Sequence, residues 1–307
     1  MVIDRRHRPG PLNGVRVVSM AVNLPGPLAS ARLQSLGAAV TKIEPPTGDP
    51  AASISQGWYG DLVAGQEVVT LDLKELRDRD RLDGRLAQAD LLLTASRPAA
   101  LARLNLSWGR LHTAFPRLCQ VAIVGHGAGG ENVPGHDLTY QAGAGILSPP
   151  HMPLVLIADL AGAERAATEA AALLLARSRG HGSGYAQVAL AEVAEDFAEP
   201  FRRGLTRPGG MLGGGHPGYR IYRTLDGYVA VAALEPHFWQ RLLSQLGVEG
   251  RADVVAAALQ TQPTAYWAQW AAERDLPLAA VCAPSGASGP AAGEPPSSHR
   301  GEPTYPR

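Results

Sequence analysis

The sequence predicts an α/β fold built on a doubly wound parallel sheet, because strand-like and helix-like segments alternate along residues 1–200. Residues 15–20 (VRVVSM) form a short valine-rich run, and residues 27–36 lead as a helix to the stop signal Gly37. Residues 39–44 (AVTKIE) form the next strand-like run. A strand, a helix and a strand in this order make a β-α-β unit, whose two strands run parallel.

The rest of the large domain continues this alternation. Residues 154–158 (LVLIA) are apolar throughout, as expected of a strand that is buried on both faces. The alanine-rich residues 161–179 are predicted to form a helix that ends at Gly180. Further strands are expected at residues 68–71, 89–94, 118–124 and 185–190.

A smaller domain with antiparallel strands is expected to follow. Residues 219–224 and 228–232 are strand-like and flank Leu225-Asp226-Gly227, and an Asp-Gly pair between two such runs is a hairpin signal. From Ala283 onward the chain consists mostly of Pro, Gly, Ser and Ala without apolar periodicity, which is typical of a disordered tail. We therefore expect a large domain over residues 1–200, a small α+β domain over 201–282 and a tail over 283–307.

The composition argues against several classes of protein. Lys+Arg and Asp+Glu both count 28, so no basic excess indicates a nucleic-acid partner. The only cysteines, Cys119 and Cys282, are too few for a disulfide scaffold and lack the spacing of a metal site, so we expect a cytoplasmic protein without a bound metal. No run of about 18 apolar residues is present, and the amino end has no apolar signal core, so neither a membrane span nor secretion is expected.

Three groups able to transfer protons follow predicted strands or turns. His136 and Asp137 come after Pro134-Gly135, Asp159 comes directly after the apolar run 154–158, and Glu235 follows the second strand of the hairpin. Ligands of open α/β sheets bind outside the carboxyl ends of the strands, where at least Asp159 and Glu235 are expected.

Each group also has a simpler explanation. Asp137 and Asp159 stand where a helix needs an N-cap, and His136 could be an ordinary turn residue. Glu235 precedes Pro236, a residue suited to the first helical position, but glutamate is a poor N-cap. The residues alone leave both explanations open.

Seven short motifs, taken in their order and spacing, resemble the class III CoA-transferases of the CaiB/BaiF type, and most closely the α-methylacyl-CoA racemase branch. The resemblance runs from about Leu12 to about Val248. It implies a Rossmann-like large domain, a smaller domain and a homodimer of two interlocked chains. The motifs are residues 11–17 (PLNGVRV), 36–44 (LGAAVTKIE), 69–74 (VTLDLK), 96–98 (SRP), 135–137 (GHD), 157–160 (IADL) and 222–227 (YRTLDG).

The resemblance also implies roles for the candidate residues. As in the racemases, His136 and Asp159 would exchange protons on opposite faces of an acyl-CoA enolate, with Glu235 orienting His136 and Asp137 as a supporting residue. The helix after Asp159 would supply an amide for the enolate oxygen. As in the transferases, Asp159 would instead attack the thioester and form an acyl-aspartyl anhydride.

Coenzyme A, carried as an acyl-CoA substrate, is the ligand that the resemblance implies. Lys42 and Arg97 match family positions and are expected to hold its nucleotide end, Lys42 as a point charge and Arg97 through a bidentate phosphate contact. Residues 60–68 lack the basic stretch of the relatives, and after Cys282 the sequence gives way to the expected tail. A degenerate member with a binding or regulatory role is therefore the third alternative, beside racemase and transferase.

Overall fold

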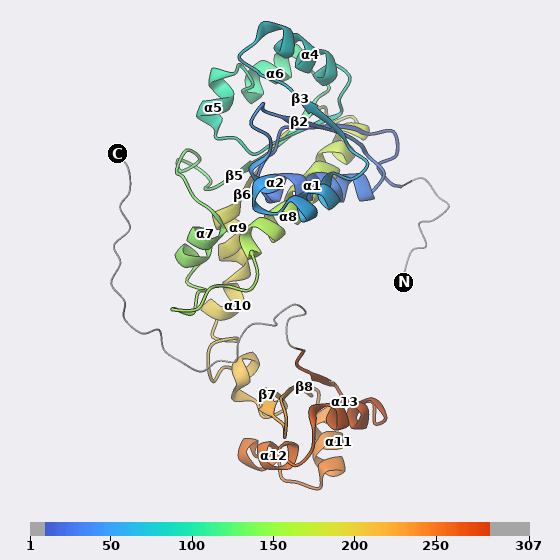
Figure 1. Ribbon diagram of the computed structural model, residues 1–307, viewed down its shortest axis with the longest axis vertical. Helices are drawn as coiled ribbons and strands as arrows, with labels where there is room; N and C mark the ends of the chain where they lie inside the picture. The colour runs from blue at the N-terminus through green and yellow to red at the C-terminus, as the bar shows by residue number, and fades with distance from the viewer. Residues whose placement is uncertain (1–9, 283–307) are drawn as a thin grey trace. The chain divides into compact units, whose positions relative to one another are not determined.

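The computed structural model describes residues 10–282 and divides the chain into two compact units, one up to Arg202 and one from Arg203 onward (Figure 1). The expected tail over residues 283–307 lies outside the described residues.

The first unit is built on a six-stranded sheet in which all neighbouring strands are parallel. The strand order is β3-β2-β1-β4-β5-β6, so the direction of winding reverses between β1 and β4. This confirms the α/β class and the parallel sheet. The strands are β1 (Arg16–Ser19), β2 (Ala39–Glu44), β3 (Glu67–Thr70), β4 (Leu91–Thr94), β5 (Cys119–Val124) and β6 (Tyr185–Ala189).

Helices cover both faces of this sheet. On β4, Leu91 and Leu93 belong to the core beneath α1, α7, α8 and α9, whereas Leu92 belongs to the core beneath α4, α5 and α6. Because alternate residues of a strand face opposite sides, a sheet covered on both faces needs continuous apolar strands, and β4 and β5 are buried throughout. The helices are α1 (Pro25–Ser35), α2 (Pro50–Ile54), α3 (Gln56–Val63), α4 (Leu76–Leu86), α5 (Pro98–Arg103), α6 (Trp108–Ala114), α7 (Asp137–Ala144), α8 (Ile157–Ser178), α9 (Leu190–Phe197) and α10 (Glu199–Arg202).

The strand expected at residues 154–158 is wrong. Leu154 is 97% exposed, and α8 already begins at Ile157. A short apolar run does not by itself distinguish a buried strand from the start of a helix. The run belongs to the approach and first turn of α8, where Ala158 is buried and begins the apolar stripe of that helix. Asp159 therefore lies in the first turn of a long helix and not at a strand end.

The second unit packs three helices with a small antiparallel sheet, β7 (Tyr219–Arg223), β8 (Tyr228–Ala232) and β9 (Leu278–Ala280). The predicted hairpin is confirmed. Its turn is closed by Thr224, whose backbone N–H donates to the carbonyl of Gly227 (2.9 Å). The helices are α11 (Pro236–Leu246), α12 (Ala252–Leu259) and α13 (Thr264–Ala272), and a short turn segment with a left-handed Gly214 spans Met211–Gly215.

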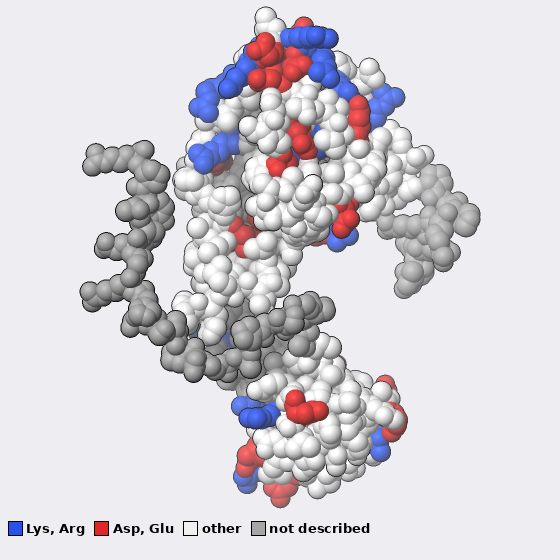
Figure 2. Space-filling view, viewed as in Figure 1, with Lys and Arg blue, Asp and Glu red and all other residues white. Residues whose placement is uncertain are grey.

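Charged side chains are mixed in sign on the surface. On the face shown in Figure 2, basic and acidic groups alternate around α4, whose sequence is LRDRDRLDGRL, and no large area of one sign is visible among the described residues. Within residues 10–282, no helix combines the length and the apolar character that crossing a bilayer requires.

Candidate active site

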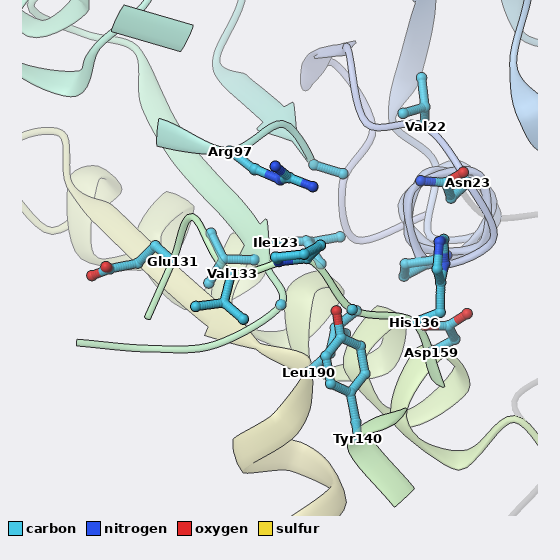
Figure 3. Close-up of a pocket in the computed structure, with 16 residues that line it drawn as sticks. Val22, Asn23, Arg97, Ile123, Glu131, Val133, His136, Tyr140, Asp159 and Leu190 are labelled. Carbon is cyan, nitrogen blue, oxygen red and sulfur yellow. The ribbon is translucent and has the colours of Figure 1, made fainter. Parts of the chain in front are cut away.

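A cavity of about 300 Å³ lies at the carboxyl edge of the parallel sheet, where β1, β4 and β5 end (Figure 3). This is the point between β1 and β4 at which the winding of the sheet reverses, where open α/β sheets bind their ligands. Polar and charged residues from four loops and helix starts converge on it. They are Asn23, Arg97, Glu131, His136, Tyr140 and Asp159.

His136 stands at the N-cap position of α7, with extended backbone angles. Its backbone N–H donates to the hydroxyl of Thr139 (3.0 Å), which fixes the first turn of the helix. The N-cap of α7 is therefore His136. The simpler explanation, in which Asp137 is the N-cap, is wrong, because Asp137 is the first residue of the helix. The imidazole is exposed and lines the same cavity as Asp159 (Figure 3).

Asp137 connects the starts of α7 and α8. The residue is only 4% exposed, and its carboxylate accepts one hydrogen bond from the backbone N–H of Asp159 (3.0 Å) and one from the side-chain amide of Gln141. The same amide of Gln141 donates to the carbonyl of Val155 (2.9 Å). This network joins two helix starts 22 residues apart in the sequence and brings Asp159 to the cavity that His136 lines. It also occupies the Asp159 amide, which is therefore not free to bind an enolate oxygen.

Asp159 lies partly buried in the cavity wall. Burial raises the pKa of its carboxyl to about 7, and the neighbouring negative charge of Asp137 adds to the effect. A carboxyl that titrates near neutral pH can both accept and return a proton under physiological conditions. The environment of Asp159 thus suits acid/base chemistry.

Tyr140 is a cavity residue to which the sequence analysis gave no role. Its ring is buried and packs edge-to-face on His126, with ring centres 5.4 Å apart. Gly125 and Gly135 leave the space that its ring and hydroxyl fill, because a Cβ on either glycine would lie within 2.6 Å of the tyrosine. Its position in the sequence could have indicated this, because Tyr140 follows His136 by four residues and residues one helical turn apart lie on the same face of a helix.

The two residues expected to hold the nucleotide end have different environments. Arg97 precedes α5, is exposed and lines the cavity on a wall apart from His136 and Asp159 (Figure 3). Lys42 has no exposed side-chain surface, and its ammonium is paired with Asp49 (2.7 Å). Burial lowers the pKa of Lys42, and the charge of Asp49 opposes that shift. An ammonium enclosed in this way does not reach a phosphate, so the binding role expected of Lys42 is replaced by a structural one.

Glu235 belongs to the second unit. It occupies the N-cap position of α11, and its side chain makes no capping hydrogen bond. Its partnership with His136 stays a prediction. Among residues 10–282, no three His, Cys, Asp or Glu side chains are grouped as a metal ion would require.

Several known proteins are similar to this chain in sequence. The chain is 34% identical over 261 residues to an α-methylacyl-CoA racemase of Mus musculus, covering 78% of this chain and 65% of the racemase. It is 28% identical over 310 residues to a probable fatty acyl-CoA transferase of Mycobacterium tuberculosis, covering 89% of this chain and 78% of that protein. The chain thus spans slightly less than two thirds of the length of the mouse racemase.

Solved structures show the same fold. A hypothetical protein from Mycobacterium tuberculosis superposes with a TM-score of 0.78 at 26% identity, over 90% of this chain and 86% of the other. A CaiB/BaiF family protein from Brucella suis superposes with a TM-score of 0.74 at 20% identity, which shows the fold alone. The sequence model of the family described as CoA-transferase family III matches residues 12–291, and the chain belongs to that family.

Proposed function

We propose that this protein acts on acyl-CoA thioesters and racemises or epimerises the α-carbon of 2-methylacyl groups by proton transfer. The observation that carries the proposal is the placement of Asp159, with a pKa of about 7, in the same cavity as His136. Inverting an α-carbon requires one group that removes the proton from one face and a second group that delivers a proton to the other. The similarity to α-methylacyl-CoA racemases supports the same reading.

The proposed reaction begins when the Asp159 carboxylate takes the α-proton. The electron pair of the broken C–H bond forms the C=C bond of an enolate, and the negative charge moves to the thioester oxygen. His136 in its protonated form then returns a proton to the opposite face. In the reverse direction the two groups exchange roles, and Glu235 is proposed to orient His136. Because the Asp159 amide is bonded to Asp137, the enolate oxygen needs another donor, and the hydroxyl of Tyr140 lines the same cavity.

A second cavity offers a place for the nucleotide end of CoA. It has a volume of about 280 Å³, lies where β1, β2, β3 and β4 end, and is lined by apolar residues together with Lys74, Ser96, Glu44 and Asp72. Val22 lines both cavities, so the two are neighbours. We assign the nucleotide to this second cavity and the thioester to the cavity of Asp159. Lys74 is exposed and takes the place of Lys42 as the candidate cation, alongside Arg97.

The test of the racemase activity uses a single enantiomer of a 2-methylacyl-CoA in deuterated water. We expect deuterium at the α-carbon and conversion to the other enantiomer, and Asp159→Ala should abolish both while circular dichroism shows an unchanged fold. An active wild type whose Asp159→Ala variant turns over equally would refute the role of Asp159. An absence of α-proton exchange in the wild type would rule out racemisation.

A class III CoA-transferase is the second candidate, favoured by the placement of a cavity carboxylate that can act as a nucleophile and by the similarity to transferases. In this reaction the Asp159 carboxylate attacks the thioester carbon and releases CoA thiolate, leaving an acyl-aspartyl anhydride. Incubation with an acyl-CoA and a labelled free acid tests it. Label appearing in acyl-CoA supports the transferase, and hydroxylamine should trap the anhydride at Asp159.

A degenerate, non-catalytic binding or regulatory protein is the remaining alternative. Calorimetric titration with CoA measures binding independently of catalysis. A protein that binds CoA and shows no turnover would favour the non-catalytic alternative. We also propose an interlocked homodimer in the cytoplasm, based on the family resemblance and the scarcity of cysteines. Analytical ultracentrifugation tests the dimer, for which a monomeric mass at micromolar concentration is the contrary result.

A further inference from the structure

The turn between β1 and α1 holds Asn23 in an unusual backbone conformation. Its φ angle is +64°, in the left-handed region that costs energy for most side chains and that asparagine tolerates better than others. Among residues 10–282 only two other non-glycine residues share this feature, Asn105 and Asp275. A left-handed residue at the edge of a ligand cavity needs a cause in the surrounding structure.

That cause is the buried ion pair of Lys42 and Asp49. One oxygen of Asp49 accepts the backbone N–H of Asn23 (3.0 Å), and the other accepts the ammonium of Lys42 (2.7 Å). The ammonium also donates to the backbone carbonyl of Ala21, two residues before Asn23. Neither charged side chain has exposed surface. Within residues 10–282, both hydrogen bonds of this ammonium thus hold one turn: the bond to Ala21 holds it directly, and the bond to Asp49 holds it through the amide of Asn23.

The side chain of Asn23 is directed to the site by this turn. Asn23 lines the cavity that also contains His136 and Asp159 (Figure 3). No hydrogen bond of its carboxamide to any of residues 10–282 is present. Its neighbour Val22 is the wall that the two cavities share. Asn23 therefore presents a carboxamide to the first cavity, directly beside the residue that the two cavities share.

We propose that Asn23 binds the pantetheine arm of acyl-CoA through its carboxamide, and that Lys42 and Asp49 are positioning residues for it. This inference rests on the proposed acyl-CoA function. With the nucleotide in one cavity and the thioester in the other, the arm between them passes Val22 and Asn23. The arm carries secondary amides, each with one donor and one acceptor, and a carboxamide can satisfy both.

The test of the binding role is Asn23→Gly, because glycine adopts the left-handed conformation freely and the substitution removes only the carboxamide. Calorimetry should show CoA binding weakened about two- to tenfold, the loss expected for one neutral hydrogen bond. Adenosine bisphosphate, the nucleotide end of CoA without its arm, should bind wild type and variant equally. Asn105→Gly is the matched control, since Asn105 has a φ of +60° and lies outside both cavities.

The possible outcomes are distinct. CoA binding that is unchanged in Asn23→Gly, or nucleotide binding that weakens by the same factor, overturns the inference while the proposed function stands. A wild type that binds no CoA overturns both. In the active enzyme the KM for acyl-CoA should rise with kcat unchanged, and a fall in kcat at unchanged KM would place the contact at the reacting centre and overturn the assignment to the arm.

The positioning role of the ion pair is tested with the double variant Lys42→Met/Asp49→Asn, which removes both charges and keeps an acceptor oxygen for the turn. We expect it to raise the KM for acyl-CoA by a similar factor and to add nothing to the effect of Asn23→Gly when the changes are combined. If the increases in KM from the ion-pair variant and from Asn23→Gly multiply when the changes are combined, the positioning role is refuted. If the double variant does not fold, Asp49→Asn alone is compared with Asn23→Gly in its place, and circular dichroism checks its fold because this change leaves the Lys42 ammonium without its counter-charge.

Discussion

An Asp159→Asn variant should be more stable than the wild type at about pH 8 and about equally stable at about pH 4. The native environment raises the pKa of this carboxyl from 3.8 to about 7. Between these values the folded protein keeps a proton that the unfolded chain has lost, so the free energy of unfolding of the wild type falls as the pH rises. Asparagine cannot ionise and escapes this loss.

The size of the effect follows from the shift. At about 1.4 kcal/mol per pKa unit, the wild type loses up to about 4 kcal/mol across this range, and less where water in the cavity solvates the carboxylate. Urea unfolding followed by circular dichroism from about pH 5 to about pH 8 measures it as a growing difference between variant and wild type. A difference that stays constant over this range would refute the assignment of a buried, protonated carboxyl to Asp159.

Asp226→Asn is the control of opposite sign. The backbone N–H of Thr264 donates to Asp226 (2.7 Å), and this hydrogen bond lowers the pKa of the carboxyl. A lowered pKa stabilises the fold above the pKa of the unfolded chain, and this stability is lost only as the pH falls through the lower, folded value. Asp226→Asn should therefore lower the free energy of unfolding by an amount that does not change between about pH 5 and about pH 8.

Three further variants probe the same site. Asp137→Asn removes the negative charge beside Asp159, so the limb of the pH–rate profile that reports Asp159 should move to lower pH; an unmoved limb contradicts the coupling. Gly135→Ala places a methyl group 2.5 Å from a ring carbon of Tyr140, so turnover should fall at least about tenfold and overpacking should lower the free energy of unfolding by about 1–3 kcal/mol; unchanged turnover contradicts a role for Tyr140. Lys42→Met leaves a buried carboxylate without its partner and should cost about 3–5 kcal/mol in urea unfolding, whereas a surface phosphate-binding lysine would cost almost nothing.

The local part of the fold could be predicted because it depends on neighbouring residues. The alternation of apolar runs with helical segments predicted a parallel α/β sheet, and Asp226-Gly227 predicted the hairpin in its observed position. The strand predicted at residues 154–158 is wrong because that prediction also used neighbouring residues alone. Its composition suits a buried strand, but α8 needs its last residues as the start of an apolar stripe, and that need is visible only when the helix packs on the sheet.

The sequence by itself determined the family, the class of fold and the positions of His136 and Asp159 in short motifs. Only the tertiary structure decided the chemistry available to them. The hydrogen bond from the Asp159 amide to Asp137 joins two helix starts, and burial gives the Asp159 carboxyl a pKa near neutral. Lys42 has the same charge in the sequence whether it is exposed or enclosed, and its pairing with Asp49 in the core makes it a support for the turn at Asn23. Burial and pairing depend on residues that only folding brings together, and these two quantities set the acidity and the accessibility of a charged group.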